Sequence, residues 1–174
     1  ALEFYRRIAE AVKDQFFEMK KLKGIIVGGP GPTKESFLAE GQIVTALKNK
    51  VIAVKDISYT DEYGLKVLVE LSQDVLAKQE IAKEQEILKI FFTTLGKNPD
   101  KVAYGLAEVK KALELGAADK LYLSKSLDNN KMDELREMAA STSTEVYFIS
   151  TETDEGKQFK NLGGVGALLR FAFE

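Results

Sequence analysis

Carboxylate side chains are the groups in this sequence best suited to acid–base or metal chemistry. The chain of 174 residues contains no His and no Cys, which excludes thiol nucleophiles, the commonest general base and most transition-metal sites. Two acidic groups stand out, Asp61 with Glu62, and Glu152 with Asp154 and Glu155. Each lies at the start of a predicted helix, where a carboxylate stabilises exposed N–H groups and the helix dipole. We therefore interpret both groups as helix caps and expect no catalytic residue, no metal and no cofactor.

Two glycine-rich segments invite a phosphate-binding interpretation, but neither has the required pattern. Residues 28–32 read Gly-Gly-Pro-Gly-Pro after a predicted strand. They lack the Gly-Lys-Ser/Thr ending of a phosphate-binding loop, and their two prolines remove backbone N–H donors. Residues 163–166 read Gly-Gly-Val-Gly and precede a strand rather than a helix. Both segments are interpreted as structural turns, in which glycine permits unusual backbone angles or a close approach of the backbone.

Charge and hydropathy exclude further classes of function. The 25 basic and 27 acidic residues give a formal charge of −2 and a pI of about 5.5, so no overall positive field attracts nucleic acid. The densest basic group, Lys20, Lys21 and Lys23, is interpreted as a solvated helix end. No stretch approaches the ~18 apolar residues of a membrane span. The chain begins at Ala1 inside a helical pattern, and we expect it to be a fragment of a longer protein.

The first part of the chain predicts helices packed on a sheet. From Leu2 to Met19, apolar residues recur every four positions, typical of an amphipathic helix: Phe4, Ile8, Val12 and Phe16. Apolar runs predict buried strands at 25–27 and 51–57. Helical spacing follows at 65–76. Alternating helices and strands of this kind indicate an α/β fold.

A second α/β series follows a polar segment at residues 77–86, where we place the domain boundary along a continuous helix. Strands are predicted at 102–105, 121–123, 146–149 and 167–173, with helices between them. The fold class is therefore α/β, with two α/β/α sandwich domains at residues 1–78 and 79–174.

The helix around residues 81–95 has more apolar residues than one core face can bury. Ile81, Leu88, Phe92 and Leu95 form one stripe, and a second stripe contains Ile87, Ile90 and Phe91. Adjacent Phe91 and Phe92 point about 100° apart. Two interpretations remain open: the helix is wedged between two layers, or one stripe is a partner-binding surface.

Several segments resemble the archaeal and eukaryotic class I peptide chain release factors. Residues 26–34 and 56–59, with Gly64-Leu65, resemble the middle domain of this family. Tyr104-Gly105 with residues 111–117 resembles the start of its C-terminal domain, and residues 155–171 resemble its end. The resemblance follows the family order along nearly the whole chain, and the Gly-Gly-Pro-Gly-Pro turn indicates the archaeal branch.

The resemblance implies a role in translation termination in the cytoplasm. The full-length protein would direct stop-codon-dependent release of the nascent peptide on the ribosome. The stop-codon-reading domain and the Gly-Gly-Gln loop that promotes hydrolysis are missing from this sequence, so we expect the chain not to be an enzyme. Residues 1–78 would scaffold that loop. The C-terminal domain would dock an elongation-factor-like translational GTPase through Phe92 and Leu95.

The resemblance has further implications for partners and for domain size. The ribosome and the ribosome-recycling ABC ATPase are the other partners that it implies. Many family members carry a small insertion in the C-terminal domain, and we expect this chain to lack it near residues 127–131.

Two alternatives are retained. Pelota, a ribosome-rescue relative, shares both domains and lacks the insertion and the Gly-Gly-Gln loop, but residues 56–59 and the Gly-Pro turn favour a release factor. The other alternative is an independent RNA-binding module, because the C-terminal domain resembles kink-turn-binding ribosomal proteins. The acidic pI and the lack of a basic stripe with aromatic side chains argue against it. We therefore expect no strong binding to free nucleic acid and no membrane binding.

Overall fold

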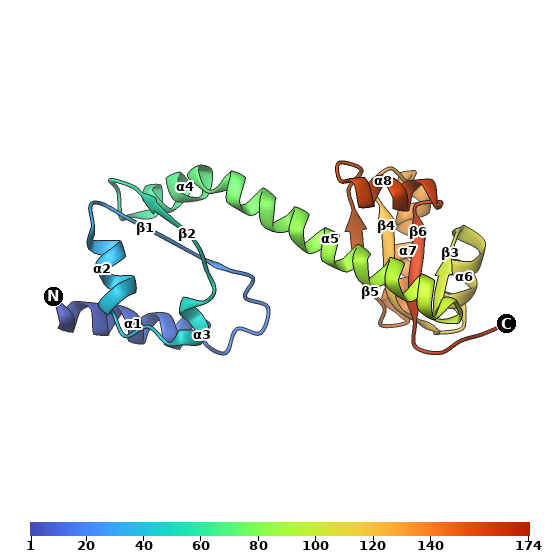
Figure 1. Cartoon of the computed structure of the whole chain (residues 1–174), viewed down its shortest axis with the longest axis horizontal. Coiled ribbons are helices and arrows are strands. Elements are labelled where there is room, and N and C mark those ends of the chain that lie inside the picture. The colour runs from blue at the N-terminus through green and yellow to red at the C-terminus, as the bar shows by residue number, and fades with distance from the viewer. The chain divides into compact units, whose positions relative to one another are not determined.

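The computed structural model describes residues 1–174 and divides into two compact units, Ala1–Gln79 and Glu80–Glu174. Both units contain helices and strands, which confirms the predicted α/β fold class. Figure 1 shows the elements along the chain, and the boundary between the units lies inside the long helix α5 (Gln73–Lys97). None of the helices combines the length and the apolar composition that crossing a lipid bilayer would need.

The first unit contains a two-stranded parallel sheet, in which β1 (Ile25–Gly29) pairs with β2 (Val51–Asp56). Its helices are α1 (Leu2–Phe16), α2 (Thr33–Glu40), α3 (Thr45–Lys48) and α4 (Glu62–Leu71), followed by the first turns of α5. Ser72, which is fully buried, separates α4 from α5, so the helical pattern predicted at 65–76 is two helices rather than one.

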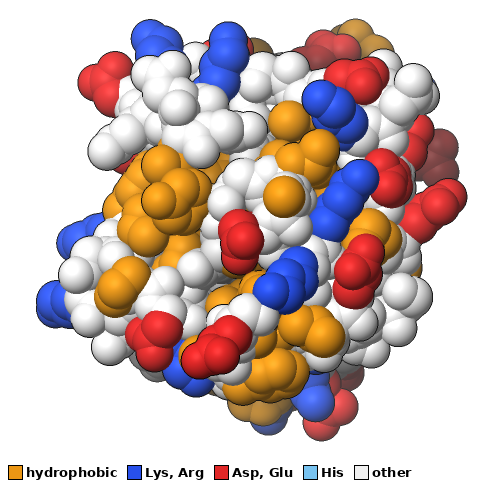
Figure 2. Space-filling view, turned by 90° about the vertical axis from the view of Figure 1, so that its right-hand side faces the viewer, with side chains coloured by type: hydrophobic (Ala, Val, Ile, Leu, Met, Phe, Trp, Pro, Cys, Tyr) orange, Lys and Arg blue, Asp and Glu red, His pale blue; other side chains and the backbone are white.

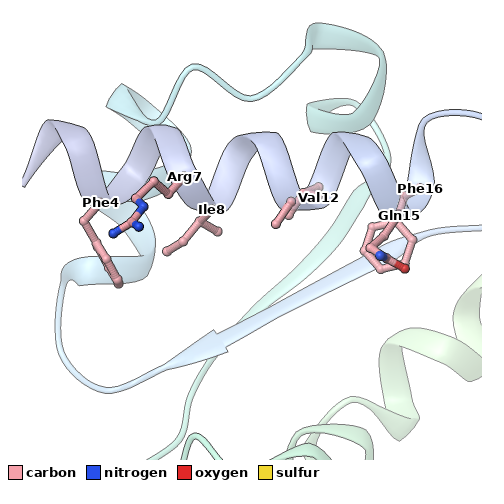
Figure 3. A pocket seen from close by; sticks show the side chains of 7 residues that line it. Phe4, Arg7, Ile8, Val12, Gln15 and Phe16 are labelled. Atoms are coloured by element: carbon pink, nitrogen blue, oxygen red, sulfur yellow. The ribbon is translucent and has the colours of Figure 1, made fainter.

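Helix α1 buries a different side from the one that its apolar stripe suggests. The buried residues of α1 that pack with Phe37 of α2 are Tyr5 and Ala9, and of the apolar stripe only Ile8, which is half-buried, packs against this cluster. The stripe Phe4, Ile8, Val12 and Phe16 instead lines an open groove of about 430 Å³, and its side chains point to one side of the helix (Figure 3). A two-stranded sheet offers no further strand to cover this side, and Phe4 remains 56% exposed.

The Gly-Gly-Pro-Gly-Pro turn is fixed by contacts within the first unit. Gly31 has a φ of +57°, a backbone conformation that favours glycine. The buried Lys34 ammonium donates a hydrogen bond to the Gly31 carbonyl at 2.6 Å and another to the Asp56 carboxylate at the end of β2. The hydrogen bond with Asp56 raises the pKa of Lys34. These contacts connect the two strand ends and support the interpretation of a structural turn.

The second unit is an α/β/α sandwich around a four-stranded sheet of order β3-β6-β4-β5. The parallel pair is β4 with β5, and β6 runs antiparallel to both of its neighbours. The strands are β3 (Val102–Tyr104), β4 (Ala118–Ser124), β5 (Glu145–Ile149) and β6 (Val165–Leu169). After a short 3-10 turn at Pro99–Lys101, the helices are α6 (Leu106–Glu114), α7 (Asn129–Ser141) and α8 (Asp154–Asn161).

Two apolar clusters cover the two faces of this sheet. Leu113 of α6 and Leu135 of α7 belong to one cluster with inward-facing side chains of β4 and β6. Leu88 and Phe91 of α5 belong to the other, together with Phe159 of α8. Helices therefore cover both faces, as the alternating pattern in the sequence predicts.

The last strand is shifted relative to the predicted segment 167–173, because β6 begins at Val165 and ends at Leu169. Beyond Leu169 the chain leaves the sheet at Arg170. The Arg170 guanidinium donates hydrogen bonds to the carbonyl oxygens of Gly116, Thr142 and Ser143. The apolar residues that follow are thus a tail beyond the sheet.

Two stacked tyrosines should make the second unit sensitive to alkaline pH. The rings of Tyr122 and Tyr147 lie 5.6 Å apart at an interplanar angle of 27°. Burial raises the pKa of the Tyr122 phenol above its ordinary value and that of Tyr147 to about 12. The unfolded chain ionises these phenols near pH ~10. Below that pH these two phenols therefore do not change the free energy of unfolding of the second unit. As the pH rises towards 12, the unfolded chain loses the phenol protons first, and the free energy of unfolding should decrease.

A titration can check this expectation by recording tyrosinate absorbance and circular dichroism together. Part of the tyrosinate signal should appear only as the folded signal disappears. Ionisation of all six tyrosines with an unchanged circular dichroism spectrum would show that the two phenols are not protected by the fold.

Candidate partner-binding site

Helix α5 buries one face that combines residues from both apolar stripes of the sequence. Leu88 and Phe91 are completely buried and pack with Tyr122, Ile149 and Phe159. The predicted division of Leu88 and Phe91 between different stripes is wrong, because residues three apart lie on the same side of a helix.

The other apolar residues of α5 lie on either side of this buried face. Ile87, Phe92 and Leu95 are half-buried against the same cluster. Ile81 and Ile90 are 40% and 48% exposed. Neither predicted stripe is therefore fully buried or fully exposed.

Phe92 lies in a shallow groove between α5 and α8, within the second unit. The groove has a volume of about 540 Å³, and its lining residues are Gln85, Glu86, Lys89, Phe92, Thr93 and Glu155. The Phe92 ring meets the buried Phe91 ring edge to face, with centroids 5.4 Å apart and an interplanar angle of 81°. Leu95, the other predicted partner residue, is half-buried but does not line the groove. Phe92 is thus an apolar side chain in the groove whose ring packs on the buried ring of Phe91.

Polar contacts between α5 and the segment around α8 set the geometry of this groove. The Glu84 carboxylate accepts hydrogen bonds from the backbone N–H and the hydroxyl of Ser150, the latter at 2.8 Å. Gln85 Nε2 donates to Glu155 Oε2 at 3.3 Å. These contacts could not be predicted from the sequence, although Glu155 itself was noted as part of an acidic group, because no local pattern connects positions 66 and 70 residues apart.

The two acidic groups lie at helix starts, as expected, but they do not play the same part. Asp61 caps α4, because its Oδ1 accepts the Gly64 N–H at 3.0 Å. At α8 the cap is Thr153, whose hydroxyl accepts the Gly156 N–H at 2.9 Å. Asp154 and Glu155 occupy the first helical turn, where they complement the dipole. The expectation that acids cap α8 directly is therefore wrong.

The second glycine-rich segment supports the groove from the sheet side. Gly163 and Gly164 have φ angles of +120° and +71° and form the turn into β6. A Cβ atom at Gly166 would lie 2.7 Å from the Phe91 ring. Glycine at this position therefore allows the close approach that the sequence predicts. The Phe91 ring that occupies this space also contacts the Phe92 ring edge to face.

The connection between β4 and α7 is short and internally bonded. The Ser124 and Ser126 hydroxyls are 2.7 Å apart. Leu127 packs against the core, and Asp128 caps α7 by accepting the Asn130 N–H at 3.2 Å. The turn at 125–128 is thus a closed structural unit.

Comparison with known families matches both units of the chain. The family model described as eRF1 domain 2 matches residues 1–78, and the one described as eRF1 domain 3 matches residues 81–173. Peptide chain release factor subunit 1 of Thermococcus kodakarensis is 36% identical over 222 residues, covering 99% of this chain and 54% of the relative. The Pyrococcus abyssi protein of the same name is 35% identical, covering 97% and 53%. The chain therefore spans about half the length of these relatives.

The alignment with the Thermococcus protein also extends over more positions than the chain has residues. The difference is 48, from 222 positions against 174 residues. The relative thus contains internal residues that have no counterpart here.

Solved structures of release factors and of Pelota are similar to the chain. The crystal structure of the archaeal translation termination factor aRF1 is 28% identical, with a TM-score of 0.50 over 97% of this chain and 50% of that one. Archaeal Pelota, in a structure described as ribosome-bound Pelota and ABCE1, is also 28% identical, with a TM-score of 0.73 over 99% and 50%.

The fold is thus shared by both families, and the curated relatives that decide between them are named release factors. The Pelota alternative is not better supported. Because the two family models together match nearly every residue in family order, this chain belongs to the archaeal and eukaryotic class I peptide chain release factors and contains their second and third domains.

Proposed function

We propose that this chain is the scaffolding and GTPase-docking part of a translation termination factor of the cytoplasm. The full-length protein would release the nascent peptide at a stop codon on the ribosome. In the full-length protein the first unit would scaffold the Gly-Gly-Gln loop, and the second unit would bind an elongation-factor-like translational GTPase. Membership of the release factor family supports this role. The ribosome-bound structure of Pelota with ABCE1 makes the ribosome and a recycling ABC ATPase candidate partners for this chain.

The observation that carries the docking proposal is the position of Phe92. A half-buried aromatic side chain in a groove, held by a fully buried ring beneath it, is the arrangement typical of interface hot spots. Leu95 extends the apolar contact by one helical turn on the same helix. We assign Phe92 and Leu95 as partner-binding residues on this basis.

This part of the protein would act by binding rather than by catalysis. The segment that most resembles the catalytic loop is Glu40-Gly41-Gln42, which follows α2. A Cβ atom at Gly41 would lie 2.1 Å from the Phe37 carbonyl oxygen, so this glycine closes a helix. Its burial supports a structural role for the segment.

The missing insertion is proposed to lie at the turn between β4 and α7. Support comes from the additional internal residues of the Thermococcus relative and from the closed turn at 125–128. In relatives, such an insertion would extend from this turn without changing the sheet.

Binding of the GTPase should depend on Phe92 more than on its neighbours. Calorimetric titration of the chain with an archaeal elongation-factor-like GTPase bound to GTP should show that Phe92→Ala weakens binding by about 2 kcal/mol, or about 30-fold. Leu95→Ala should cost about 1 kcal/mol, because Leu95 flanks the groove.

Ile90→Ala is the matched control, because Ile90 is 48% exposed on the same helix and does not line the groove. It should leave the dissociation constant unchanged. If Phe92→Ala binds as tightly as the wild type and only lowers the melting temperature, Phe92 is a core residue and the assignment is wrong.

A further inference from the structure

The acidic excess of the second unit is concentrated around the Phe92 groove. Residues 80–174 contain 13 Lys and Arg against 16 Asp and Glu, a formal charge of −3. The lining residues come from two stretches of the chain, 80–93 and 150–158, which together hold six carboxylates against three lysines, also −3, and of these carboxylates Glu86 and Glu155 line the groove. The rest of the unit is formally neutral. On the side that carries α6 and the C-terminus, acidic and basic side chains are interspersed (Figure 2).

The charged groups in the groove itself form no ion pair within the chain. Glu86 and Glu155 line the groove beside Phe92, and Lys89 is the one cation among the lining residues. The six ion pairs of the structure involve none of these three side chains. Glu155 accepts a hydrogen bond only from the neutral Gln85 amide. The carboxylates of Glu86 and Glu155, beside the Phe92 ring, are therefore able to form ion pairs with a binding partner.

We propose that the Phe92 groove receives a basic protein surface, in which an apolar side chain packs on Phe92 and Lys or Arg side chains lie opposite Glu86 and Glu155. This rests on the proposed function, with the translational GTPase as the protein that presents the basic surface. An RNA partner fits less well, because the two carboxylates would repel its phosphates.

The expected contribution of these charges is faster association and partner selection rather than a large gain in affinity. Charges at the rim of an interface mainly steer the encounter, and salt screens their effect. Glu84 is not part of this function, because both of its carboxylate oxygens accept hydrogen bonds from Ser150.

The test is stopped-flow association of the chain with a GTP-bound archaeal elongation-factor-like GTPase, at about 50 mM and about 300 mM salt. The wild-type association rate should fall roughly tenfold between these conditions. Glu86→Gln with Glu155→Gln should slow association about fivefold at low salt and remove most of the salt dependence. Lys89→Gln should act in the opposite direction and accelerate association.

Glu108→Gln with Glu137→Gln is the matched control, because it also removes two carboxylate charges, from exposed positions on α6 and α7, and leaves every ion pair intact. It should change the association rate by less than about twofold, because salt screens the effect of charges far from the interface. Equal rates for the wild type and the Glu86/Glu155 variant, or an equal effect of the Glu108/Glu137 control, would overturn the inference.

The outcome also separates this inference from the proposed function. If Phe92→Ala weakens binding but the charge variants do not, the docking site stands and the basic partner surface is refuted. If the wild-type chain does not bind the GTPase at either salt concentration, both proposals are wrong.

Discussion

Replacing Phe91 by alanine is expected to lower the free energy of unfolding of the second unit by about 3–5 kcal/mol. The Phe91 side chain is completely buried. Its ring contacts Tyr122 at 5.2 Å and Phe159 at 5.5 Å between centroids, and it fills the space above Gly166. Alanine would leave a cavity where α5, α8 and the sheet meet, and the surrounding backbone is too regular to close it.

The same change should also weaken GTPase binding, because the Phe92 ring rests edge to face on Phe91. Urea unfolding can be followed through the methyl NMR signals of Leu121 and Leu123, which belong to the core of the second unit. These signals report on the unfolding of the second unit alone, whereas a signal averaged over the whole chain would combine the unfolding of both units. Ile90→Ala, on the exposed side of α5, should cost less than about 0.5 kcal/mol. A comparable loss for both variants would contradict the assignment of Phe91 to the core.

The strands of this fold could be predicted because their apolar runs are short and continuous. The predicted segment at 51–57 contains β2, and the one at 146–149 lies within β5. Apolar runs of this kind reveal strands from local sequence alone. The expectation that β2 is a buried strand is wrong, because its residues are half-buried or exposed and Val54 is 38% exposed in a sheet of only two strands. The α/β/α organisation of the second unit then follows from the order of the elements.

The buried side of a helix was harder to predict, because apolar residues of α1 and α5 occupy more than one side. In α1, Tyr5 and Ala9 are buried although the regular stripe lies elsewhere. In α5, the pair Leu88 and Phe91 is selected by the residues that it meets, Tyr122 and Phe159, which are far away in the sequence. Periodicity cannot identify a partner of this kind.

The groove was only partly predictable for the same reason. Phe92 was found through the family resemblance and the surplus of apolar residues on its helix. The contact between Glu84 and Ser150 depends on the path of β5, and no sequence signal marks it. The charges of Glu86 and Glu155 belong to the same site only because α5 and α8 both contribute residues to the groove.

Gly156→Ala is expected to destabilise the second unit by about 2–3 kcal/mol and to disturb the groove at the same time. A Cβ atom at Gly156 would lie 2.1 Å from the Ser150 carbonyl oxygen and 2.9 Å from the Thr153 hydroxyl. Ser150 also holds Glu84, and Thr153 caps α8, so no neighbour can move without breaking a hydrogen bond. The first turn of α8 would have to shift away from the end of β5.

Gly96→Ala makes the same chemical change where there is space. Gly96 lies near the end of α5, and a Cβ atom there would meet no other atom within 4 Å. Alanine should therefore stabilise the helix by about 0.5–1 kcal/mol, because it reduces the conformational entropy of the unfolded chain. The free energies of unfolding of Gly156→Ala and Gly96→Ala can be compared by urea unfolding, and the amide exchange rates of α8 can be measured in both variants. The changes in free energy of unfolding should have opposite signs, and amide exchange in α8 should be faster only in Gly156→Ala. A stabilising Gly156→Ala would show that α8 is free to move relative to β5, and the groove would then not be a fixed feature of this domain.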